Sequence, residues 1–187
     1  MEIKPTNAED IERAVRNILT LIGEDVSRDG LVETPSRISR MCGELFAGYE
    51  KNNAPVLKPF PNESGNHGMV IDTGEFFSLC EHHMLPFFGT YRFAYIPGDT
   101  IIGLSKIARC VRYCSARLQV QERLASDILD MIGEALPDAR GMAIRLTGEH
   151  MCKRMRGARI NGMMTSVLFN GVFEADASLR NEFLNNG

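Results

Sequence analysis

The residue types best suited to chemistry gather in one short segment, "SLCEHHMLPFFG", at residues 78–89. Cys80 and His83 form a C-x-x-H pair, and thiolate with imidazole is a common set of zinc ligands. The sequence holds four histidines, and two of them, His82 and His83, are adjacent here. Because C-x-x-H is a short pattern, the segment alone fits a surface loop as well as a metal site.

A second cluster, "EHMCKRMRG" at residues 149–157, favours the metal site. If it adds one ligand, zinc has three protein ligands and one position for water, as in catalytic zinc sites. His150 and Cys152 are two residues apart, so on a strand they would point to the same face. Thiolate is the stronger zinc partner, so we expect Cys152 to bind the metal and His150 to stay free. Cys110 and Cys114 lie on the apolar face of an expected helix, where cysteine is usually buried.

Other segments carry groups that could hold a substrate. Ser105 begins an expected helix with Lys106 and Arg109 in its first turns, and such a helix start can bind phosphate. The alternative is a solvated basic face. Glu122, beside Gln121, could accept two N–H bonds from the edge of a guanine, or it could be an ordinary exposed acid.

Three arginines follow Cys152 closely, namely Arg154, Arg156 and Arg159. Either one or more of them reaches a polyphosphate, or all of them are solvated.

The periodicity of apolar residues predicts an α+β fold. A first helix ends near Ile22, and a second runs from Thr34, its N-cap, with Pro35 at its first helical position. Residues 51–68 are rich in proline and predict a linker. Beyond it we expect an antiparallel sheet with two helices, in the order of strands 69–77 and 90–97, helices 103–118 (capped by Ser105) and 120–136, and strands 141–150 and 165–175. The predicted organisation is a helical extension with linker at 1–68 and a catalytic domain at 69–187.

Composition excludes several classes of protein. The net charge of −3 argues against general nucleic-acid binding. No apolar run approaches the roughly 18 residues of a membrane span. The polar N-terminus has no signal-peptide core, and the five cysteines show no disulfide framework, so we expect a cytoplasmic protein.

Four long segments together resemble one family, GTP cyclohydrolase I: "CEHHMLPFFG", "YIPGDTIIGLSKIAR", "RLQVQERL" and "EHMCKRMRG". The segments "EDVSRDGLVETPSRI" and "GVFEADASLRNEFL" resemble that family too. The resemblance implies a T-fold, an antiparallel sheet with two helices on one face, whose subunits assemble into a barrel. It also implies a homo-oligomer, a toroidal decamer, with active sites between subunits.

The resemblance further implies a role for each residue that matches a family position. The implied zinc ligands are Cys80, His83 and Cys152, and the implied proton-transfer residues are His82 and His150. The residues implied to hold GTP are Gln121 and Glu122 for guanine, Ser105, Lys106, Arg109 and Arg156 for triphosphate, and Arg37 as a helper. The implied reaction is hydrolysis of GTP at C8 of guanine, which releases formate and leads to 7,8-dihydroneopterin triphosphate.

Two alternatives stay open, and a third does not fit the sequence. The stretch "GARINGMMTS" is shorter than its family counterpart, so the chain could be a T-fold paralogue that stops at the ring-opened formamide or uses another purine. It could instead be a non-catalytic zinc-binding subunit, although such a subunit has no need of both His82 and His150. A zinc nucleobase deaminase would carry H-x-E and P-C-x-x-C, and this sequence has no C-x-x-C.

Overall fold

The computed structural model describes residues 5–185, which fall into two compact units. The first unit ends at Asn53, and the second begins at Ala54. Within the described residues, no helix combines the length and apolar character needed to cross a membrane.

The first unit contains both predicted helices. They are α1 (Pro5–Leu21) and α2 (Thr34–Leu45), followed by the 3-10 turns η1 (Ala47–Tyr49) and η2 (Lys51–Asn53). Ser39 of α2 is buried, and its hydroxyl donates to the carbonyl oxygen of Ala8 in α1 at 3.3 Å. The prediction of Thr34 as N-cap is wrong: Glu33 occupies that position without a side-chain cap. Glu33 already has helical backbone angles, so Thr34 falls inside the first turn.

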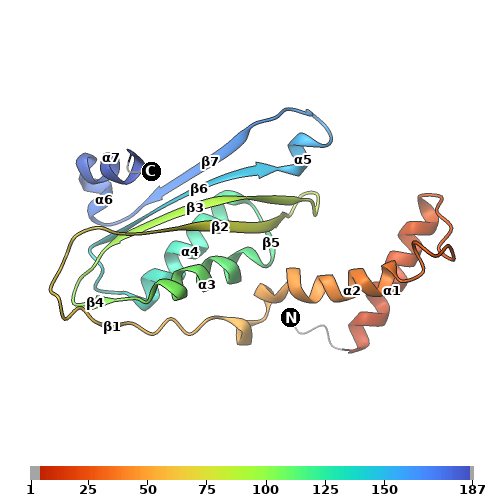
Figure 1. The fold of residues 1–187 in the computed structure, drawn as a ribbon, viewed down its shortest axis with the longest axis horizontal. Coiled ribbons are helices and arrows are strands. Elements are labelled where there is room, and N and C mark those ends of the chain that lie inside the picture. Colours follow the sequence, from red (N-terminus) through yellow and green to blue (C-terminus); the bar gives the residue numbers. More distant parts are fainter. Residues whose placement is uncertain (1–4, 186–187) are drawn as a thin grey trace. The chain divides into compact units, whose positions relative to one another are not determined.

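The second unit is built on a five-stranded sheet in the order β5-β2-β3-β6-β7 (Figure 1). The strands are β2 (Val70–Cys80), β3 (Pro86–Ile96), β5 (Leu118–Gln119), β6 (Gly141–His150) and β7 (Met163–Phe169). The predicted antiparallel pairing is confirmed for β2, β3, β6 and β7, whereas the short β5 runs parallel to β2. A separate pair joins β1 (Phe60–Pro61), from the predicted linker, to β4 (Thr100–Ile101).

Two helices, α3 (Leu104–Ser115) and α4 (Gln121–Ala135), cover one face of this sheet (Figure 1). Alternate residues of the strands, such as Phe76 and Phe87, point into the core against Ile107 of α3 and Leu124 of α4. The prediction that Ser105 caps α3 is wrong. The cap position is Gly103, whose carbonyl oxygen accepts a bond from the backbone N–H of Lys106 at 2.8 Å, so Ser105 lies within the first turn.

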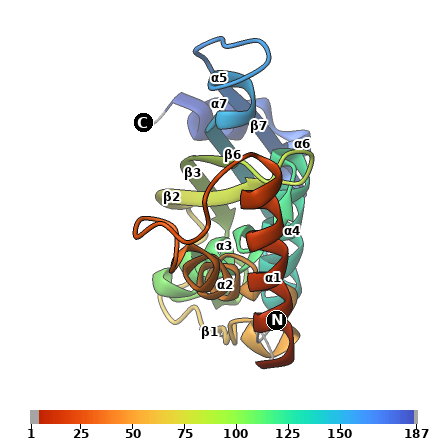
Figure 2. The same ribbon diagram turned by 90° about the vertical axis from the view of Figure 1, so that its right-hand side faces the viewer.

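The opposite face is covered at one end by α6 (Val172–Ala175) and α7 (Ala177–Asn185) (Figures 1 and 2). Phe173 and Phe183 are fully buried there against Ala94 and Ala143. The predicted strand 165–175 is therefore wrong in its second half. Gly171, at φ 56°, turns the chain into α6, and a side chain at this position would strike the carbonyl oxygen of Arg140.

Both outer strands of the sheet keep open edges among the described residues. The strand β7 pairs with β6 alone, and β2 pairs with β5 only at Leu79 and Cys80, so most of its outer edge has no partner strand. Unpaired strand edges are sites at which another chain can add strands.

Candidate active site

A tight turn between β2 and β3 presents the C-x-x-H pair. The backbone N–H of Cys80 donates to the carbonyl oxygen of Leu85 at 2.8 Å, and the carbonyl oxygen of Cys80 accepts from Met84 at 2.8 Å. Met84 adopts φ 53°, a left-handed conformation that non-glycine residues rarely take. Such strained positions cluster at functional sites. The turn leaves His82 and His83 exposed beside the buried Cys80.

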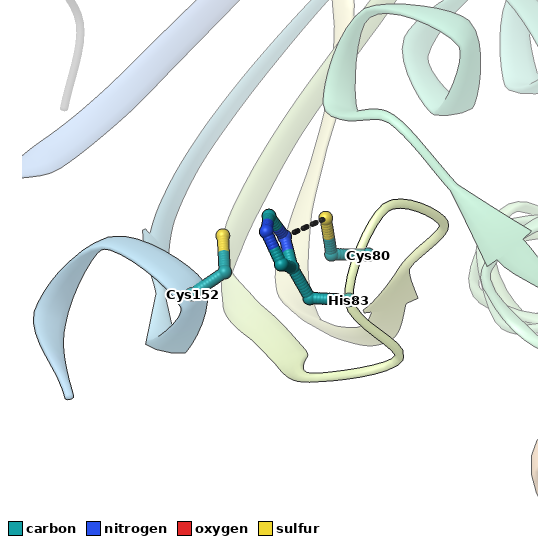
Figure 3. A group of neighbouring side chains, drawn as sticks. All are labelled: Cys80, His83 and Cys152. Carbon is teal, nitrogen blue, oxygen red and sulfur yellow. Dashed lines mark hydrogen bonds between the residues drawn. The ribbon is translucent and has the colours of Figure 1, made fainter. Parts of the chain in front are cut away.

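The third residue of the cluster comes from a short helix, α5 (Met151–Arg154). The ligand atoms of Cys80, His83 and Cys152 lie within 4.8 Å of one another, and the His83 ring lies between the two sulfur atoms (Figure 3). The predicted strand 141–150 is confirmed as β6, so Cys152 lies beyond it in α5 and does not share a strand face with His150. His150 pairs with Phe87 at the start of β3, so the helical turn after β6 lies next to the Cys80 turn.

These three side chains fit a zinc ion. Tetrahedral zinc has bonds of about 2.3 Å to sulfur and about 2.0–2.1 Å to nitrogen, which sets its ligand atoms about 3.5–3.8 Å apart. The distance from Cys80 Sγ to His83 Nδ1 is 3.9 Å, so only a small closure is needed. Two thiols and one imidazole also match the ligand preference of zinc. Among the described residues, no fourth Cys, His, Asp or Glu joins the group, so a zinc ion held there would keep one position for water.

The electrostatics of Cys152 also suit a cation. Burial, and then the neighbouring Cys80, raise the pKa of the Cys152 thiol, whereas Arg156 lowers it. Two adjacent thiolates are unfavourable without a compensating positive charge. A divalent metal ion provides that charge, because it binds cysteine in the deprotonated form.

His82 lies on the rim of this cluster. Its Nδ1 is 3.8 Å from Cys80 Sγ, and its Nε2 is 3.9 Å from a carboxylate oxygen of Glu81. Glu81 is in turn paired with Arg123 of α4. The side chain of His82 is 65% exposed, so its ring is open to a substrate.

His150 is held from two sides. Its ring stacks on Phe87, with ring centres 4.7 Å apart and an angle of 9° between the planes. Its Nε2 lies 3.0 Å from Oε1 of Gln121. Burial lowers the pKa of His150, while the Glu122 carboxylate raises it and Lys153 lowers it.

The side-chain amide of Gln121 fixes which nitrogen of His150 carries hydrogen. Gln121 is 1% exposed, and its Nε2 donates to the carbonyl oxygens of Leu146 and Met164, each at 3.1 Å. A carbonyl oxygen only accepts, so the amide has one favourable orientation, with Oε1 toward His150. His150 Nε2 must then donate, which leaves Nδ1 as the free ring nitrogen. Gly148 gives this amide its room, since a Cβ there would lie 2.7 Å from Oε1.

The predicted phosphate-binding residues lie apart from this cluster in the same chain. Ser115, at the end of α3, accepts a hydrogen bond from the Ser78 hydroxyl at 2.8 Å, close to Cys80. Ser105, Lys106 and Arg109 occupy the first turns of α3, and Ser105 is about 15 Å from Ser115 at the usual helical rise. Among the described residues, no hydrogen bond or ion pair joins these three side chains to Cys80, His83 or Cys152.

The remaining predicted substrate residues are exposed. Glu122 lies in the first turn of α4, and Arg156 follows α5. Arg37 belongs to the first unit, where its guanidinium pairs with Glu33 at 2.6 Å.

Comparison with known proteins identifies the family. The sequence profile of the family "GTP cyclohydrolase I" matches residues 11–186. The chain belongs to the GTP cyclohydrolase I family. Its curated relatives named GTP cyclohydrolase 1 include proteins of Clostridium perfringens, 44% identical with 93% of this chain and 94% of the relative covered, and of Lactiplantibacillus plantarum, 45% identical with 97% of each covered. A further relative, from Bacillus subtilis, is 41% identical, with 97% of this chain and 96% of the relative covered.

For this GTP cyclohydrolase I family member, the sequence did not reveal three parts of the site. Phe87 stacks on His150, Arg123 pairs with Glu81, and Gly148 makes room for Gln121. Each contact joins residues distant in the sequence. Phe87 lies in the segment 78–89 quoted above, but the spacing of that segment does not predict which side chain it contacts.

We expect the purified protein to bind about one zinc ion per chain, and Cys152→Ala to lose most of it, because two ligands hold zinc far less tightly than three. Metal analysis after dialysis measures this. Cys42→Ala, in the first unit, is the matched control and should keep full occupancy. Full occupancy in Cys152→Ala would show that another residue is the third ligand.

Proposed function

We propose that this chain hydrolyses GTP at C8 of the guanine ring, releases formate and forms 7,8-dihydroneopterin triphosphate. The observation that carries the proposal is the Cys80, His83 and Cys152 group with two further histidines around it. Zinc held by these three side chains supplies Lewis acidity that makes water nucleophilic near neutral pH. The names of the relatives and the family profile support GTP as the substrate.

His150 is our candidate for the proton donor to the departing ring nitrogen. Its Nε2 hydrogen is engaged with Gln121, so Nδ1 must first take a proton, which the attacking water can supply, before it passes that proton to the departing ring nitrogen. Stacking on Phe87 keeps the ring in one orientation, which matters because proton transfer requires hydrogen-bond distance. We propose that His82, whose ring is exposed beside Cys80, assists the second hydration that releases formate.

Glu122 is our candidate for the guanine anchor. Its carboxylate is exposed at the start of α4, and it acts on His150 electrostatically, so it lies near the proton donor. The adjacent Gln121 also belongs to the guanine set implied by the resemblance. The side-chain amide of Gln121 already forms hydrogen bonds with Leu146, Met164 and His150 of the same chain. We therefore propose that Gln121 orients His150 and does not bind guanine.

We also propose that the active site is shared between copies of the chain. Lys106 lies near the start of α3 and Arg109 in its middle, whereas the end of α3 bonds to Ser78, two residues before Cys80, so we infer that these cations serve the Cys80, His83 and Cys152 cluster of a neighbouring copy. A neighbouring copy could bring its α3 start to the cluster. The open edges of β2 and β7 suit such an assembly, and a toroidal decamer is the form that we expect.

The direct test is to incubate the zinc-loaded protein with GTP and identify the products by mass spectrometry, with formate measured separately. Formate and a dihydropterin triphosphate in equal amounts support the proposal. A ring-opened formamide as the end product would instead indicate the paralogue with a truncated reaction. Absence of any GTP conversion by the loaded oligomer would indicate a non-catalytic zinc subunit.

His150→Ala should keep its zinc and its affinity for GTP but lose about a hundredfold or more in rate, the usual size of a general-acid contribution. It should accumulate the ring-opened formamide. His67→Ala is the matched control, because the His67 ring bonds to the carbonyl oxygen of Pro97 and belongs to none of the proposed site residues. Loss of zinc from His150→Ala, with zinc retained in Cys152→Ala, would mean that the two roles are exchanged.

Gln121→Met should lower kcat by about tenfold to a hundredfold while KM for GTP changes little, because a misplaced catalytic ring reacts slowly. Ser166→Ala is the control: it removes one acceptor of the Gln121 amide, at 3.2 Å, and leaves both carbonyl acceptors. Nitrogen NMR of histidine-labelled wild-type protein should show hydrogen on Nε2 of His150. A rise in KM alone would return Gln121 to the guanine site.

Mixing inactive Cys152→Ala and Arg109→Ala chains should restore part of the activity, since some shared sites in a mixed oligomer receive both intact residues. Activity is measured after the two variants are unfolded and refolded together, with each refolded alone as the control. If mixed oligomers are verified by mass and stay inactive, the two residues do not serve one site in the way that we propose.

A further inference from the structure

The face of the sheet opposite α3 and α4 carries two adjacent rows of polar side chains. In the first row, Thr73 of β2 pairs with Arg92 of β3, and Arg92 pairs with Arg145 of β6. In the second row, Thr90 of β3 pairs with Thr147 of β6. Residues two apart on a strand share a face, so both rows point the same way.

These rows line a cavity of about 570 Å³. The side chains that contribute to its wall are those of Thr73, Glu75, Thr90, Arg92, Arg145 and Thr147. None of them belongs to the metal group or to the residues that we assign to GTP. The volume is within the range of roughly 300–1,000 Å³ that small-molecule sites usually have.

The two arginines are not neutralised within the described part of the chain. They stand directly opposite each other in an antiparallel pair, where like charges are destabilising. Neither has a carboxylate within the ion-pair distance of 4.0 Å in that part, although Glu75 is in the same wall. Buried Nε of Arg92 also lacks a hydrogen-bond partner.

Arg92 is nevertheless held in place. Its guanidinium lies 5.6 Å from the ring centre of Phe183, a fully buried residue of α7. A cation over an aromatic face is attracted to it, so Arg92 is positioned before any ligand binds. The second row adds hydroxyl groups, and the Thr147 hydroxyl is 3.2 Å from that of Thr165 on β7.

We propose that this cavity binds a phosphate group between Arg92 and Arg145. Guanidinium forks match phosphate oxygens with two parallel N–H bonds, and threonine hydroxyls can donate to the remaining oxygens. The cavity is larger than phosphate, and Glu75 can accept from a hydroxyl, so the phosphate monoester of a small hydroxylated molecule fits better than free phosphate. The proposal concerns a second site and does not depend on the proposed function.

Calorimetric titration tests the site with two probes, inorganic phosphate and glycerol 3-phosphate, at matched ionic strength in chloride. Wild-type protein should bind glycerol 3-phosphate more tightly than inorganic phosphate. Arg145→Gln should weaken this binding at least tenfold while zinc content and GTP turnover stay unchanged. Arg140→Gln, an exposed arginine outside the cavity, is the matched control. Arg156→Gln shows whether the phosphate site that we assign to GTP contributes to the signal.

Thermal unfolding adds a second test, in which Arg145→Gln should gain stability although it loses ligand binding. In phosphate-free buffer, Arg145→Gln should unfold at a higher temperature than wild type, because it removes a like-charge pair. Added glycerol 3-phosphate should raise the midpoint of wild type and of Arg140→Gln but not that of Arg145→Gln.

Several results would overturn the proposal. They are equal binding by wild type and Arg145→Gln, no binding of either probe by wild type, and a lower midpoint for Arg145→Gln in phosphate-free buffer. A change in oligomeric state of Arg145→Gln in sedimentation would also overturn it, because the arginines would then meet acidic groups of a second copy. Binding of inorganic phosphate alone would overturn the monoester as the preferred ligand.

Discussion

The buried side-chain amide of Gln121 links the sheet and the start of α4 to His150, the proposed proton donor. It donates to carbonyl oxygens of β6 and β7, accepts from His150, and begins α4. A buried amide without these partners would cost roughly 1–3 kcal/mol, so the strands, the helix start and the histidine are fixed together. The hydrogen position on His150 is therefore decided by backbone atoms that take no part in the reaction.

Much of the fold could be predicted from the sequence, because apolar periodicity reports which side of an element is buried. The strands β2, β3 and β6 appear where apolar residues alternate along the chain. The helices α3 and α4 appear where apolar residues recur every three to four positions. The errors fell at element ends. Ser105 and Thr34 looked like caps, yet the chain already turns before each of them, and Gly171 ended β7 through a backbone angle that sequence patterns do not reveal.

The cluster of Cys80, His83 and Cys152 was predictable for a different reason. Cysteine and histidine are rare in this sequence, so two clusters containing both types were informative even before their distance was known. The sequence does not predict which element carries Cys152 or which residues Gln121 contacts. Cys152 lies next to Cys80 on the single helical turn α5. The Gln121 amide can lie beside His150 because Gly148 has no side chain there. Such contacts arise from packing between strands, which spacing along the chain cannot encode.

The placement of the two cysteines has a consequence for local stability. Cys80 lies at the tip of one hairpin and Cys152 on a turn beyond β6, and they are distant in the sequence although adjacent in space. A metal ion that joined them would act as a cross-link between two tips whose neighbouring residues, 81–84 and 153–161, are exposed. Its removal would open these tips first and leave the sheet and its helices folded. Protease sensitivity confined to residues 81–85 and 153–162 would then report the metal content of a sample that is otherwise native.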